Sequence, residues 1–199
     1  DRVGRRRSIG LGGVILVVWG MAAWMILPIH NESVRTLPNE ESVVATIQSS
    51  VTTRGMYEFP GMPKNLHSMS PQEQQAAMEA WTAKRQRGPT GLLIYDPRGS
   101  DPFMMSQFII GFIISVISAL FAAWFLSRST ALASSYVARV AFCGMLGIFV
   151  SFTTHLPFWN WMGFPPDHTT AMIIDTVLGW IVAGLGIAAI VKAPKQETA

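Results

Sequence analysis

Long runs of apolar residues divide the polar parts of this chain into separate blocks. A helix that crosses the hydrocarbon core of a bilayer needs about 20 mostly apolar residues. Runs of about this length or more occupy residues 8–27, 103–126, 136–156 and 167–191. Proline follows the first and last runs closely, at Pro28 and Pro194. The pattern predicts an all-α integral membrane protein with four transmembrane helices.

Basic residues at the ends of these runs predict the orientation, because lysine and arginine near helix ends stay on the cytoplasmic side. Eight such residues are Arg2, Arg5, Arg6, Arg7, Arg128, Arg139, Lys192 and Lys195. The link at 156–166 contains none. All eight share one side only if four helices cross. We therefore expect a multi-pass protein of the bacterial inner membrane with both termini in the cytoplasm and residues 29–102 as a periplasmic loop.

The same pattern predicts three regions: a basic start with the first helix at 1–28, an extracytoplasmic segment at 29–102, and a three-helix transmembrane bundle with a short cytoplasmic tail at 103–199. Basic residues before an apolar run are also typical of signal peptides. A run of about 20 residues favours a retained anchor instead. Because the sequence opens on aspartate rather than methionine, we expect further residues to precede it.

The extracytoplasmic segment reads as a small, mostly helical and irregular cap. Apolar spacing predicts a short helix over 39–50, and glycine with proline predicts an irregular loop over 54–64. Ser70, Pro71 and Glu73 form a strong helix start, and that helix should end before Gly88. Residues 92–95 read as a short extended run. About 74 residues are marginal for an independent core, so we expect the cap to lean on the membrane helices or on a partner.

Composition supports the membrane class and excludes others. Charged residues make up 14% of the chain, against about 25% in an average soluble domain, which excludes a disordered chain and argues against a typical soluble enzyme. The single cysteine, Cys143, excludes an intramolecular disulfide. The net charge of +3 does not indicate nucleic-acid binding, because the basic residues lie where membrane topology requires them.

Small residues recur along the predicted helices at four-residue spacing, which places each row on one helix face. Transmembrane helices associate through such close contacts, because lipid tails are as apolar as leucine. We therefore expect the helices to pack against one another along these rows and to contact lipid on their other faces. The rows consist of Gly111, Ser115, Ala119 and Ala123, then Cys143, Gly147 and Ser151, then Gly179 with Ala183 and Gly184 with Ala188.

Asp175 is the one acidic residue well inside an apolar run, about two turns from the start of its helix. Ionisable residues at membrane depth are costly and often functional. His168, Met172 and Asp175 share a helix face, and His155 closes the preceding run. These four are candidates for a proton relay, a metal site or a polar ligand pocket. The structural alternative, which we favour, is that Asp175 accepts hydrogen bonds from Thr153, Thr154 or a tryptophan N–H. We expect its partner to come from the third helix or from the link at 156–166.

Other chemistry has weaker support in the sequence. Methionine and histidine suit copper(I), but the methionines form no repeated cluster and are common gap fillers. They are Met56, Met62, Met69, Met104, Met105 and Met162, with His67 near Met69. No phosphate-binding loop, CxxC, HExxH or GxSxG motif is present, so we expect no catalytic residues and no bound cofactor.

The residues at 55–61, at 87–97 and at 157–161 form three local strings. These strings resemble a family of small bacterial inner-membrane proteins that has no assigned activity. The resemblance implies a bacterial membrane protein and transfers no catalytic residue. Our leading hypothesis is a non-catalytic accessory or scaffolding subunit, whose partners are other membrane subunits and lipids. Two alternatives stay open: a small transporter or redox- or metal-linked protein that uses the polar site, and a membrane enzyme acting on lipid or quinone.

Overall fold

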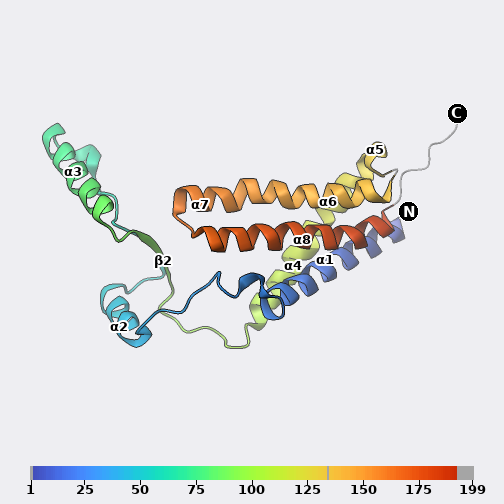
Figure 1. Cartoon of the computed structure of the whole chain (residues 1–199), viewed down its shortest axis with the longest axis horizontal. Coiled ribbons are helices and arrows are strands. Elements are labelled where there is room, and N and C mark those ends of the chain that lie inside the picture. Colours follow the sequence, from blue (N-terminus) through green and yellow to red (C-terminus); the bar gives the residue numbers. More distant parts are fainter. Residues whose placement is uncertain (1, 134, 192–199) are drawn as a thin grey trace. The chain divides into compact units, whose positions relative to one another are not determined.

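The computed structural model of the protein describes residues 2–133 and 135–191. Three continuous helical segments are long and apolar enough to cross a membrane: α4 (Met105–Arg128), the segment Tyr136–Met162, and α8 (Pro166–Ile190). The first helix, α1 (Arg2–Met25), contributes a shorter apolar stretch at Leu11–Met25. The part of the chain that the structure describes is therefore mostly helical (Figure 1) and contains three candidate membrane spans. The fourth predicted span is not among them.

The third helical segment runs further than its apolar pattern predicts. It consists of α6 (Tyr136–Val150), a π-helical turn η3 (Ser151–His155) and α7 (Leu156–Met162). The predicted end at Leu156 is wrong because the helical segment continues through Pro157, which directly follows the π-helical turn. The helix ends instead at Gly163, which adopts a left-handed conformation with φ of 71°.

The chain divides into two compact units, each described here by itself: Asp1–Arg35 with Asp101–Ala199, which we call the helical unit, and Thr36–Ser100, which we call the intervening unit. Within the helical unit, α6 packs on α8, α8 packs on α1, and α1 packs on α4. We expected the last three helices to form the bundle. Instead α1 lies between α4 and α8, while short elements η1 (Pro28–His30) and α5 (Thr130–Ala133) flank the long helices.

Glycines permit this close packing. A Cβ atom on Gly13 would lie 2.9 Å from the Cα of Val116, so the backbones of α1 and α4 lie close together at this position. A Cβ on Gly147 would lie 2.9 Å from the Cα of Val177 on α8. At one end of the unit, α4, α6 and α8 share a small buried core. Its residues are Ala119, Ala122, Ala123, Leu126, Cys143, Ala183, Ile187 and Val191.

The predicted packing rows are placed as follows. In the α4 row, Ala119 and Ala123 are buried and Ser115 is half-buried, but a Cβ on Gly111 would meet no atom within 4 Å. The α6 row is buried against α8: Cys143 faces Gly184, and Ser151 donates its hydroxyl to the Gly147 carbonyl. Gly179 contacts Trp19 of α1, while Ala183 and Ala188 are fully buried.

The intervening unit contains α2 (Glu40–Ser50), β1 (Gly55–Phe59), the short helix η2 (Leu66–Ser68), α3 (Pro71–Arg87) and β2 (Gly91–Tyr95). The capping box at Ser70 and Glu73 is formed as predicted. The irregular loop predicted over 54–64 is wrong in its first half, because β1 pairs antiparallel with β2, with Met56 opposite Ile94. Tyr57 and Phe59 favour a strand, and their signal was outweighed by the neighbouring glycines and prolines.

Candidate functional site

The ionisable residue furthest into the apolar part of α8 is Asp175, whose side chain is 14% exposed. Its Oδ1 atom accepts the indole N–H of Trp19 at 2.6 Å, and its Oδ2 atom lies 3.1 Å from Nε2 of His30. The Trp19 N–H also reaches the Asp175 carbonyl at 3.1 Å. Both side-chain partners therefore come from α1 and the turn η1, and the prediction of a partner from the third helix or the following link is wrong.

His30 is held on several sides and is only 7% exposed. The ring of Trp24 stacks on the imidazole, with centroids 3.8 Å apart and an interplanar angle of 9°. Its Nδ1 atom lies 3.1 Å from the Ser33 hydroxyl, which in turn lies 3.0 Å from the His30 carbonyl. Trp24 and Asp175 thus fix the ring in position and orientation.

Proton counting defines two arrangements of this cluster. If the Ser33 hydroxyl donates to the His30 carbonyl, Nδ1 of His30 must donate to Ser33, and Nε2–H donates to Asp175, so the imidazole is doubly protonated. If the hydroxyl turns towards Nδ1, the imidazole is neutral, and the carbonyl keeps the Ser33 backbone N–H at 3.1 Å. Both arrangements satisfy every polar group, and they differ by one proton on Nδ1 of His30 and by the direction of the Ser33 hydroxyl.

The other candidate residues lie near this cluster without joining it. Nε2 of His155 lies 2.8 Å from the Thr176 hydroxyl, which ties the third helical segment to α8. Nδ1 of His168 donates to the Ser33 carbonyl at 3.0 Å, and its ring packs against Phe164. Met172 is half-buried on α8. Thr153 instead donates to the Phe149 carbonyl.

At the start of α8, Arg35 and Asp167 form a salt bridge of 2.7 Å. Both side chains are exposed, so this pair contributes little to stability. Together with the His168 contact, it fixes the segment after η1 against the start of α8. The segment from Pro28 to Arg35 is therefore attached to α8 at three heights: by Asp175, by His168 and by Asp167.

The buried polar side chains of this cluster are paired with one another. In the part of the chain that the structure describes, no buried side-chain nitrogen or oxygen lacks a partner. Over the same residues, no three histidine, cysteine or acidic side chains are grouped to hold a metal ion. The cluster joins α1 to α8 by charged and polar contacts. Sequence reasoning missed Trp19 and His30 because nothing in the order of the chain shows that α1 lies against α8.

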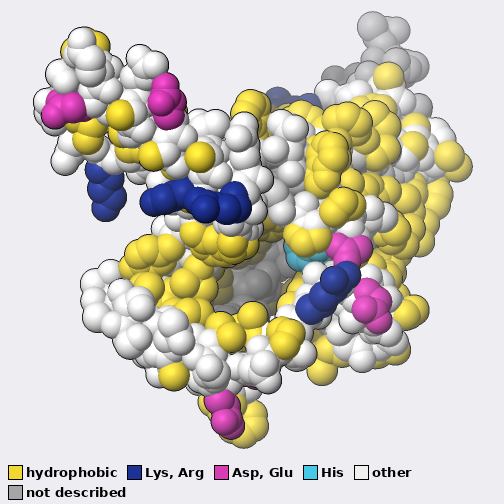
Figure 2. Space-filling model, turned by 60° about the vertical axis from the view of Figure 1, so that its left-hand side comes forward, with side chains coloured by type: hydrophobic (Ala, Val, Ile, Leu, Met, Phe, Trp, Pro, Cys, Tyr) yellow, Lys and Arg dark blue, Asp and Glu magenta, His cyan; other side chains and the backbone are white. Residues whose placement is uncertain are grey.

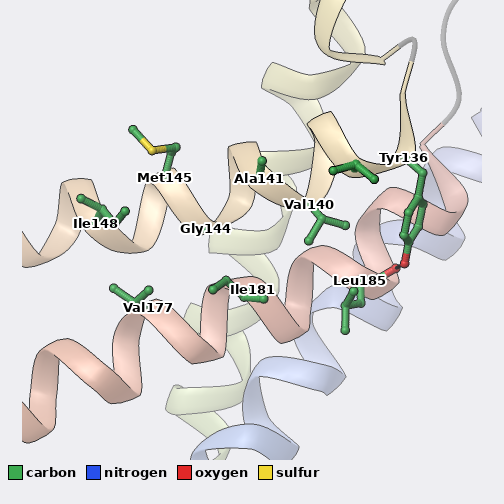
Figure 3. A pocket seen from close by; sticks show the side chains of 10 residues that line it. Tyr136, Val140, Ala141, Gly144, Met145, Ile148, Val177, Ile181 and Leu185 are labelled. Atoms are coloured by element: carbon green, nitrogen blue, oxygen red, sulfur yellow. Dashed lines mark hydrogen bonds between the residues drawn. The ribbon is translucent and has the colours of Figure 1, made fainter.

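A second feature of the helical unit is an apolar groove between α6 and α8, with a volume of about 510 Å³. Figure 3 shows that its walls are formed by the facing sides of the two helices, with Tyr136 at one end and Ile148 towards the other. We call this the α6–α8 groove; it is lined by Tyr136, Val137, Val140, Ala141, Gly144, Met145, Ile148, Val177, Ile181 and Leu185.

The chain was compared with protein families, with curated proteins and with solved structures. No protein-family model, no curated protein and no solved structure matches the chain. The resemblance carried by the three local strings therefore stays a prediction.

Proposed function

We propose that the protein is a non-catalytic accessory or scaffolding subunit of a larger bacterial membrane protein complex. The observation that carries this proposal is the pairing of Asp175, His30, Trp19 and Ser33. A site that binds a substrate or transfers a group needs polar atoms directed at that ligand. Here the polar atoms are directed at one another, across the contact between α1 and α8.

The intervening unit also supports this proposal. Its sheet has only two strands, and a two-stranded sheet is marginally stable in water without further cover. Met56 and Ile94 face each other across the strands, yet they are 63% and 77% exposed. A partner subunit that covers this apolar pair would stabilise the unit.

The experiment is purification of the tagged full chain from its native membrane in a mild detergent, followed by mass spectrometry of the bound proteins. A larger complex with a constant stoichiometry is expected. The matched variant Met56→Glu with Ile94→Glu should weaken that complex while leaving the helical unit intact, whereas Glu58→Gln, on the same face of β1, should not. Recovery of the unmodified chain as a lone particle in every mild detergent would contradict the proposal.

The proposed topology has four crossings, both termini in the cytoplasm and the intervening unit on the periplasmic side of the inner membrane. It is supported by two basic residues on either side of the short connection between α4 and α6. Arg128 lies in the last turn of α4, and Arg139 lies in the first turn of α6. In a Cys143→Ser background, a membrane-impermeant thiol reagent should label Ser68→Cys in intact cells and should spare Ser129→Cys. The reverse labelling pattern would invert the orientation.

A second candidate function is a small transporter in which the His30–Asp175 pair takes up a proton. The specific observation in its favour is that the Ser33 hydroxyl can satisfy His30 in both protonation states. Asp175→Asn separates the two functions. A scaffold keeps its complex and all measurable activity, whereas a transporter keeps its fold and loses proton-dependent transport.

A further inference from the structure

The outer edge of β2, in the intervening unit, has no neighbouring strand. The sheet contains only β1 and β2, so β2 pairs with β1 along one edge alone. Alternate residues of an antiparallel strand direct their N–H and C=O groups to opposite edges. Apart from the ladder with β1, no hydrogen bond within the described residues reaches positions 91–95. The outward backbone groups of β2 can therefore pair with another strand.

This edge also lacks the features that usually prevent strand addition. Proteins protect strand edges with charged side chains, proline, bulges or a covering element. β2 reads Gly-Leu-Leu-Ile-Tyr and pairs with β1 without a bulge. The contacts of α3 are made instead to β1 and the residue after it. Arg85 lies 3.1 Å from the Glu58 carboxylate, and the Trp81 indole N–H donates to the Pro60 carbonyl at 3.1 Å.

The intervening unit has little core of its own to stabilise this sheet. Its residues 36–100 are all described, and none of them is buried. Figure 2, in which the intervening unit comes forward, shows hydrophobic side chains exposed on its surface. A two-stranded sheet is marginally stable in water, and further strands stabilise it. Strand addition at β2 would supply both backbone hydrogen bonds and apolar contacts.

The sequence of β2 is complementary to itself. A two-fold axis through Leu93 would pair two antiparallel copies with Leu93 opposite Leu93, Leu92 opposite Ile94, and Gly91 opposite Tyr95. Opposite positions then differ by an even number of residues, so the outward backbone groups of one copy meet those of the other. The same axis pairs all five residues of the strand.

The side chains of β2 also suit this pairing. Residues 91–95 carry no charge, so no like charges meet across the axis. β1 already pairs Gly55 with Tyr95 and Phe59 with Gly91, so a glycine lies opposite an aromatic residue at both ends of the sheet. The contact between copies repeats this arrangement, because Gly91 again meets Tyr95. A second copy of the chain is thus an occupant whose sequence matches the edge.

We propose that two copies of the chain associate through their β2 strands and form a four-stranded sheet in the order β1, β2, β2, β1. About four to six backbone hydrogen bonds would join the copies, depending on which alternate residues face outward. The contact closes on itself by two-fold symmetry, the commonest symmetry of homo-oligomers. It uses the strand edge and does not depend on the accessory role proposed above, so either can fail without the other.

Cysteine cross-linking of the full chain in its native membrane tests this contact. Two copies with different tags carry Leu93→Cys in a Cys143→Ser background and are treated with a short bifunctional thiol reagent. Directly opposite residues have Cβ atoms about 4.5–5.5 Å apart, so a product with both tags is expected. Met56→Cys is the matched control, because it is exposed on β1. Its two copies would lie three strand spacings, or about 14 Å, apart and should give about fivefold less product.

A second pair of variants tests the register and does not alter Leu93. Leu92→Cys on one copy and Ile94→Cys on the other should form a disulfide more readily than either variant with itself, because only the mixed pair is directly opposite. Absence of the Leu93→Cys product together with absence of the mixed disulfide would overturn the proposal, as would equal yields from Met56→Cys. A Leu93→Cys product with a different protein in place of the second copy would also overturn it. Cross-linking detects copies of this chain, whereas mass spectrometry of bound proteins tests the accessory role.

Discussion

Replacement of Asp175 by leucine tests whether the polar cluster stabilises the contact between α1 and α8. The substitution removes the acceptor for two side-chain donors, Trp19 and His30. The substitution affects these two donors differently. The Trp19 N–H keeps a second acceptor, the backbone carbonyl of residue 175, at 3.1 Å. His30 is buried and loses the partner of its Nε2 atom.

The expected cost follows from that difference. A buried polar group left without a partner costs about 1–3 kcal/mol. Because only His30 is left in that state, Asp175→Leu should lower the free energy of unfolding by about 1–3 kcal/mol. Asp175→Asn should cost less, since its amide oxygen accepts from Trp19 and its amide nitrogen donates to a neutral His30. Removal of both partners in His30→Leu with Asp175→Leu should recover part of the loss, because no buried donor then stays unpaired.

Reversible unfolding in mixed micelles, followed by tryptophan fluorescence and circular dichroism, measures these differences. Asp167→Asn is the control, because it removes an exposed salt bridge on the same helix and should change stability by less than about 1 kcal/mol. If Asp175→Leu is as stable as the wild type, the cluster does not stabilise the helix contact. If the double variant is as unstable as the sum of the two single variants, the residues are not coupled as the distances indicate.

Three further predictions concern packing and the intervening unit. Gly147→Leu should separate α6 from α8 and lower the thermal stability, because even a Cβ atom at position 147 would lie 2.9 Å from the Cα of Val177. Gly111→Ala is the control and should fold at least as well as the wild type, because a Cβ at position 111 meets no atom within 4 Å. Ser70→Ala should speed hydrogen exchange at the first turn of α3 several-fold, and an unchanged rate would mean that the capping box is dispensable. The Ser70 hydroxyl and backbone N–H hold the pKa of Glu73 below its usual value. The cap therefore stabilises α3 at neutral pH and is lost as the pH falls through that lowered pKa, which pH-dependent hydrogen exchange at this turn should detect.

The sequence was most informative where local chemistry decides the structure. The Ser70 capping box formed as predicted, since every group in it lies within four residues. The long apolar runs gave three candidate spans for the same reason: length and composition are local properties. The π-turn at Ser151–His155 shows the limit of such reasoning, because the effect of Pro157 depends on how the preceding turn is wound.

The polar cluster could be predicted only in part. Asp175 stood out because a carboxylate in an apolar run must find a partner, and a tryptophan N–H was among the expected donors. Which tryptophan it would be depends on which helices are neighbours. Trp19 and Asp175 are 156 positions apart, and no pattern in either helix identifies the other. Gly12 and Gly13 allow α1 to approach α4 and α8 closely, but two glycines do not indicate which helix lies opposite them.

The position of α1 explains why one carboxylate serves several tasks in this fold. A helix that is followed by a unit as long as Thr36–Ser100 has no short loop to hold it against its neighbours, so its place must come from side-chain contacts. Packing of small residues supplies proximity, but it fixes the depth of the helix weakly, since apolar faces slide with little cost in lipid. The hydrogen bonds of Asp175 fix the position of α1 along its axis, which packing alone leaves variable. The carboxylate holds Trp19 within α1 and His30 directly after it, and a shift of α1 by one turn, about 5.4 Å, would break both bonds at once. The cost that a buried carboxylate imposes is thus offset by a fixed register between α1 and α8, and this register determines where the chain leaves the helical unit at Arg35.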